Sequence, residues 1–89
     1  MKATITRYYT ESVEGSDERP CFDFELEDEG ELVWSDSVTS QAAHVLLLKF
    51  AQNEALAKLF VAITYCDPDN YTLLVGQCFE EKERVLRER

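Results

Sequence analysis

The chain has 89 residues, of which 45% are hydrophobic, and it carries a formal net charge of −9 at neutral pH. This length suits one acidic domain, residues 1–89, with a modest core. Its apolar runs are far too short to cross a membrane, and its nine basic residues are too few for direct binding to nucleic acid.

The first 28 residues are expected to form two strands joined by a loop. Residues 2–10 are rich in threonine and tyrosine, which predicts a first β-strand. Residues 11–20 are polar and contain Gly15 and Pro20, so we expect a mobile loop. Residues 21–28 alternate between apolar and acidic side chains, which predicts a strand with one buried and one solvated face.

A turn at residues 28–30 leads to a short third strand from residue 32, antiparallel to the second. A helix follows, with four candidate N-cap residues, Ser35, Ser37, Thr39 and Ser40. One face of this helix is apolar, and its members are Ala43, Leu46, Leu47 and Phe50. We expect it to end near Asn53, with one or two further helical turns over residues 54–59.

Residues 60–66 and 71–78 are strand-like and are separated by a turn, Asp67-Pro68-Asp69-Asn70, which predicts a second hairpin. Residues 79–89 form a charged tail with favourable i,i+4 pairs, which favours a short C-terminal helix. The whole pattern predicts an α+β fold, about β-β-β-α-β-β, with an antiparallel sheet packed on one main helix.

Residues that usually carry catalysis are scarce. The single histidine, His44, is predicted on the helix near its polar face, and no zinc-binding, phosphate-binding or nucleophile motif occurs. The three cysteines lack a C-x-x-C spacing and are interpreted as small buried hydrophobic residues. We therefore expect no enzyme activity, no metal and no cofactor. The N-terminal stretch lacks the apolar core of a signal peptide, so we expect a cytoplasmic protein.

The charge is concentrated in residues 11–36, the acidic segment. It holds eleven of the eighteen acids and one base, Arg19, so it carries −10 while the rest of the chain carries +1. A field of one sign attracts basic surfaces. The candidate binding residues are the acids Asp23, Glu25, Glu27, Asp28, Glu29 and Glu31 of the predicted acidic hairpin, with Trp34, Tyr8 and Tyr9 as aromatic anchors. The alternative is a merely solvated exterior.

In size, charge and lack of catalytic motifs, the chain resembles the small acidic inhibitors, often encoded by phages, that include DNA mimics and many anti-CRISPR proteins. The resemblance implies a nucleic-acid mimic that docks its acidic hairpin on a basic, nucleic-acid-handling protein. Membrane binding is not expected, because anionic lipids repel the acidic face.

A second hypothesis is a structural protein that forms a homodimer or larger homo-oligomer. The predicted hairpin of residues 60–78 is apolar on both faces, which is typical of a covered or interface strand pair. The candidate interface residues are Val45, Leu48, Val61, Ile63, Tyr65 and Leu74. In this case the acidic face is only solvated.

Overall fold

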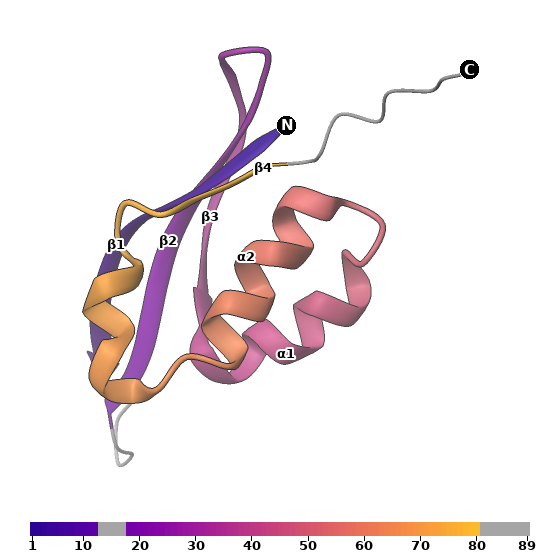
Figure 1. Cartoon of the computed structure of the whole chain (residues 1–89). Helices are drawn as coiled ribbons and strands as arrows, with labels where there is room; N and C mark the ends of the chain where they lie inside the picture. The colour runs from indigo at the N-terminus through magenta and orange to yellow at the C-terminus, as the bar shows by residue number, and fades with distance from the viewer. Residues whose placement is uncertain (13–17, 81–89) are drawn as a thin grey trace.

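The computed structural model describes residues 1–12 and 18–80. Figure 1 shows one antiparallel sheet, in the order β3-β2-β1-β4, with the helices gathered on one side of it. The elements in chain order are β1 (Lys2–Ser12), β2 (Glu18–Asp28), β3 (Glu31–Thr39), α1 (Ser40–Lys49), α2 (Glu54–Thr64), the 3-10 helix η1 (Pro68–Leu74) and β4 (Cys78–Glu80). The predicted α+β class with an antiparallel sheet is confirmed.

The first two strands are longer than predicted. Pairing between β1 and β2 continues through Glu11↔Arg19 to Ser12↔Glu18, so residues 11–12 and 18–20 of the predicted loop are strand. Residues 13–17 of that loop lie outside the described residues. The polar composition of this stretch fits the solvent-exposed end of a long two-stranded ribbon, where the side chains need no core to cover them.

The alternation in β2 is confirmed. Phe22, Phe24 and Leu26 are at most 5% exposed, while the acids between them lie on the other face of the sheet. Asp28 pairs with Glu31, which leaves Glu29 and Gly30 as a two-residue turn with φ of 54° and 84°. Positive φ at both positions is the type I′ geometry that matches the twist of a hairpin. β3 extends to Thr39, well beyond the predicted short strand.

Side-chain caps fix both helix starts. The Thr39 hydroxyl accepts a hydrogen bond from the N–H of Ala42 at 3.1 Å, so Thr39 is the N-cap of α1. The Asn53 Oδ1 accepts one from the N–H of Leu56 at 3.1 Å and caps α2 in the same way. The prediction that the first helix ends near Asn53 and that further helical turns follow is confirmed, although α2 extends to Thr64, beyond the predicted residues 54–59.

The predicted hairpin of residues 60–66 and 71–78 is wrong. α2 continues to Thr64, residues 68–74 form η1, and only Cys78–Glu80 pairs as a strand, with β1. The buried positions of α2, which are Ala55, Leu56, Leu59, Phe60 and Ile63, have helical spacing. The sheet therefore packs on two helices rather than one main helix.

The predicted tail falls partly inside the sheet. Phe79 and Glu80 belong to β4, where Ala3 and Lys2 are their partners on β1. Residues 81–89, with the predicted C-terminal helix, lie outside the described residues.

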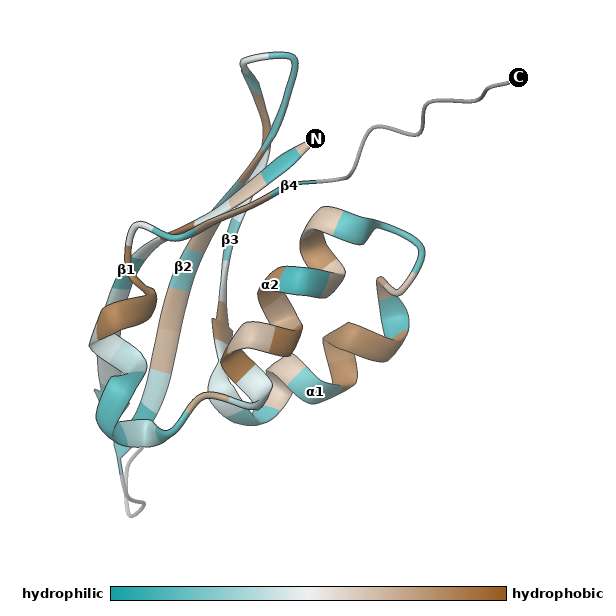
Figure 2. Cartoon of the chain, in the orientation of Figure 1, coloured by the Kyte–Doolittle hydropathy of each residue, from teal (hydrophilic) through white to brown (hydrophobic). Residues whose placement is uncertain are grey.

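The core lies between the sheet and the helices. Phe24 packs edge-on against Trp34 and Phe60, and Phe22 packs edge-on against Tyr71 of η1. Figure 2 shows that hydrophobic and hydrophilic stretches alternate along α1 and α2, as expected for helices with one buried side. Over residues 1–12 and 18–80, no helix has the length and apolar character needed to cross a membrane.

Candidate functional site

The sheet has one face without helices, here called the open face. Its side chains follow from the register, because they alternate with the buried positions of each strand. They include Lys2, Thr4, Arg7 and Tyr9 of β1, Cys21, Asp23, Glu25 and Glu27 of β2, Leu32, Ser35 and Ser37 of β3, and Cys78 and Glu80 of β4, although Cys21 is only 4% exposed. Asp23, Glu25 and Glu27, here called the acidic row, thus share one solvated face, as the alternation in the sequence predicts.

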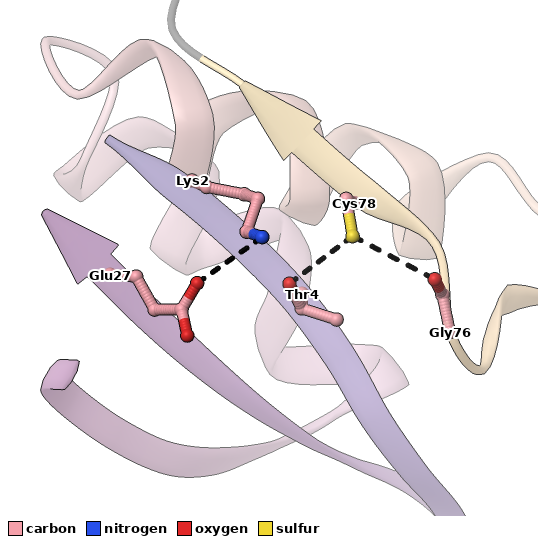
Figure 3. Close-up of polar contacts among 5 residues, drawn as sticks. All are labelled: Lys2, Thr4, Glu27, Gly76 and Cys78. Atoms are coloured by element: carbon pink, nitrogen blue, oxygen red, sulfur yellow. Dashed lines mark hydrogen bonds and ion pairs between the residues drawn. The ribbon is translucent and has the colours of Figure 1, made fainter. Parts of the chain in front are cut away.

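Two of these three acids are paired with bases on β1. The Arg7 Nε donates to Asp23 Oδ2 at 2.9 Å, and the Arg7 guanidinium also stacks on the Tyr9 ring at 4.5 Å. The Lys2 Nζ lies 3.3 Å from Glu27 Oε1 (Figure 3). A hydrogen bond to Glu27 and the charge of that carboxylate raise the pKa of Lys2. The acidic row is therefore partly neutralised within the sheet.

The other edge of the open face carries a thiol. The Thr4 hydroxyl donates to the Cys78 Sγ at 3.4 Å, and the thiol donates to the Gly76 carbonyl at 3.8 Å (Figure 3). Together with the main-chain pairing of β4, these contacts hold Cys78 against β1. All three cysteines are free, but only Cys21 is fully buried, and Cys78 is exposed, so the interpretation of all three as buried residues is wrong for Cys78.

Five of the ten carboxylates that have no ion pair among the described residues lie around the β2–β3 hairpin. Among the described residues, no ion pair involves Glu25, Asp28, Glu29, Glu31 or Asp36. Four of them are exposed, and Glu25 is half-buried between the paired acids of β2. Asp36 Oδ1 accepts a hydrogen bond from the N–H of Ser37 at 2.8 Å. The negative field is therefore centred on the turn and on β3 rather than on the full row of β2.

The three candidate aromatic anchors do not lie together. Tyr8 packs against Phe22 and Tyr71 on the helix side, and Trp34 packs against Phe24 and Phe50 there. Tyr9 alone lies on the open face, beneath the Arg7 guanidinium. Two of the three predicted anchors therefore contribute to the core.

Two hollows border these surfaces. A shallow one of about 330 Å³ lies over the open face and is lined by Thr6, Asp23, Phe24, Glu25, Ser35, Asp36 and Ser37. An apolar one of about 800 Å³ runs beside α2, where Ala57, Val61, Ala62 and Phe79 contribute to its lining. The Glu54–Lys58 ion pair, at 3.0 Å, also lines the second hollow.

The candidate oligomer residues divide into two groups. Val45, Leu48, Val61 and Tyr65 are 62%, 71%, 40% and 76% exposed on α1 and at the outer side and end of α2. Ile63 and Leu74 belong to the core, where they are 0% and 7% exposed. The last two are therefore unavailable to a partner, because the assumed hairpin is a helix followed by η1.

His44 is exposed on α1. Within residues 1–12 and 18–80, no group of three His, Cys, Asp or Glu side chains is placed to hold a metal ion.

Comparison with known proteins adds no relative. No family model matches the chain, and neither a curated protein nor a solved structure is significantly similar to it.

Proposed function

We propose that this protein is a non-enzymatic binding module, a small acidic inhibitor or nucleic-acid mimic of the phage or anti-CRISPR kind. It docks the β2–β3 hairpin on a basic, nucleic-acid-handling protein. The observation that supports this most is the group of unpaired carboxylates around the turn, Glu25, Asp28, Glu29, Glu31 and Asp36, on a hairpin that projects away from the helices (Figure 1).

The acids Asp23, Glu25 and Glu27 of β2 form a row that is comparable in pattern to a phosphate backbone. Acids at alternate positions of a strand are about 6.6–6.8 Å apart, whereas phosphates advance about 3.4 Å per nucleotide along one DNA strand. The hairpin is thus a sparser array of negative charge than DNA. Arg7 and Lys2 reduce its density at Asp23 and Glu27, so recognition centres on the turn and on Glu25.

The charge acts mainly on the rate of association. Complementary potentials steer two proteins together before contact and are screened by salt. Of the three candidate aromatic anchors, Tyr9 is the one on the open face, where its ring packs against the Arg7 guanidinium. We place the protein in the cytoplasm, where its three free thiols remain reduced.

Three forms of the tagged protein test this proposal by capture of partners from the native host lysate at low and high salt. The first is the wild type, and the second is the hairpin variant, Glu25→Gln with Glu29→Gln and Glu31→Gln. The third is a matched control with the same change in charge, Asp67→Asn with Asp69→Asn and Glu18→Gln, because Glu18 lies at the end of β2 that is remote from the turn. Asn at position 67 keeps an oxygen for the N–H of Asp69.

A basic nucleic-acid-binding protein that is retained by the wild type and the control, and lost with the hairpin variant or at high salt, supports the proposal. Equal retention by all three forms at both salt concentrations contradicts it. The paired acids Asp23 and Glu27 are left intact, because their removal also releases Arg7 and Lys2.

A second candidate function is a structural or homo-oligomeric protein. It is favoured by the exposed apolar side chains Val45 and Leu48 of α1 and Val61 of α2. Light scattering at high micromolar concentration decides this case. A larger mass that returns to the monomer value with Leu48→Glu supports it, and a monomer in the wild type removes it.

A further inference from the structure

β3 is the longer of the two edge strands of the sheet. It has nine residues, pairs only with β2, and no other strand of the described chain adjoins it, whereas β4 at the opposite edge has three residues. An edge strand presents main-chain N–H and C=O groups that can pair with another extended chain. This edge borders the acidic turn, so main-chain pairing and charge are available at the same place.

The charges of β3 disfavour a second copy of this chain as the occupant. β3 contains Glu31 and Asp36 and no base, and β2 beside it contributes four further acids within Asp23–Asp28. Pairing of two such edges brings like charges together, which is destabilising. The Asp36 carboxylate also accepts a hydrogen bond from the N–H of Ser37. An added cationic strand that pairs with this N–H displaces the carboxylate and offers it a base as a new partner.

The open face has room for a long side chain beside this edge. Ser35 and Ser37 lie opposite Glu25 and Asp23 in the register, and all four line the shallow hollow of about 330 Å³. Neighbouring strands are about 4.8 Å apart, so a strand added to β3 lies about 9.6 Å from β2. The long stem of a Lys or Arg side chain can cross the small serines toward β2.

On the β2 side of the hollow, Glu25 is the carboxylate that such a base would meet. Asp23 is held by Arg7 at 2.9 Å, whereas no base of the described residues pairs with Glu25. We propose that β3 receives an extended segment of a basic partner as a fifth strand, with one Lys or Arg crossing Ser35 to Glu25. This inference rests on the proposed function and specifies its geometry.

Two synthetic peptides test the mode of binding. One is an extended, fluorescently labelled heptapeptide with lysine at alternate positions and threonine or valine between them. Its twin carries N-methyl groups at alternate main-chain nitrogens on one edge, which keep every charge but remove the donors that pair with β3. Affinity is measured by fluorescence anisotropy, and amide hydrogen exchange of the intact protein is followed by NMR.

The proposal predicts that the unmethylated peptide binds at least about tenfold more tightly, since a few main-chain hydrogen bonds of modest net strength are lost in its twin. It also predicts new protection of alternate amides in β3. Glu25→Gln weakens binding of the unmethylated peptide, whereas the control variant Asp69→Asn does not. The amide spectrum of each variant verifies that it is folded.

The outcomes separate this inference from the proposed function. Equal, salt-sensitive binding of both peptides overturns the fifth strand and leaves the charge-based proposal standing. Preferential binding of the unmethylated peptide with no effect of salt or of Glu25→Gln supports the strand addition and contradicts the role of charge. Absence of binding by both peptides at millimolar concentration overturns the fifth strand, while the lysate capture still decides the proposed function.

Discussion

The three cysteine side chains differ in their access to solvent. Burial raises the pKa of the Cys21 thiol, and burial with the nearby Asp67 charge raises the pKa of the Cys66 thiol. Cys78 is exposed at the edge strand β4. We expect iodoacetamide at pH 8 to label Cys78 first and Cys21 last, because the thiolate is the reactive form and must be reachable.

Timed labelling followed by peptide mass spectrometry checks this order. The variant Cys78→Ser should remove the fastest phase and leave the other two unchanged. Labelling of Cys21 at the rate of Cys78 in the folded protein would contradict the burial of Cys21, which is 4% exposed.

The Lys2–Glu27 pair predicts a pH dependence of stability at high pH. The pKa of Lys2 is raised above 10.5 in the folded protein, so the pair stabilises the fold below that pH, and this contribution is lost as the pH rises through the folded value. Urea unfolding of the wild type and of Glu27→Gln should therefore differ at pH 8 and converge toward pH 12. A difference that is the same at both pH values would contradict this account.

The partners of the acidic row could not be predicted from the sequence. The alternation in β2 correctly places its acids on the solvated face, but their bases lie on β1. Lys2 and Arg7 are five residues apart, whereas Glu27 and Asp23 are four apart, and a bulge between Ile5 and Arg7 absorbs the extra residue. Nothing in the composition of β1 marks that bulge, so the partial neutralisation was not foreseen.

Among the elements, α2 is the one that the sequence misassigned in part. Residues 59–63 are continuously apolar, and such a short run fits a buried strand or a buried helix equally well. The Asn53 cap and the buried spacing of residues 56, 59, 60 and 63 distinguish the helix from the strand. The helical spacing is visible only when the apolar run is considered together with the residues from 54 onward that precede it.

Two substitutions in α2 distinguish the helix from the strand. Ile63 is fully buried and Val61 is 40% exposed, whereas in a strand the two would share one face. Ile63→Ala should lower the free energy of unfolding by about 2–5 kcal/mol, and Val61→Ala should change it by less than about 0.5 kcal/mol. Urea unfolding measures both, and similar losses for the two variants would contradict the helix.

For the whole molecule, the sequence predicted the class of fold and the location of the charge better than the shape of the binding surface. Acidic and apolar residues separate cleanly along β2, so the two faces of the sheet could be assigned. The aromatic anchors could not, because register shifts in the β1–β2 and β2–β3 pairings decide that Tyr8 and Trp34 face the helices.

The proposed function depends on one claim, that the carboxylates of the β2–β3 hairpin without an ion pair among the described residues attract a basic partner. The most direct test is the association rate constant with the captured partner, measured by stopped-flow fluorescence at 50 mM and 300 mM salt. We predict that the hairpin variant associates about tenfold more slowly than the wild type at low salt, and that the matched control keeps the wild-type rate. Equal rates for the two variants at low salt would contradict the claim.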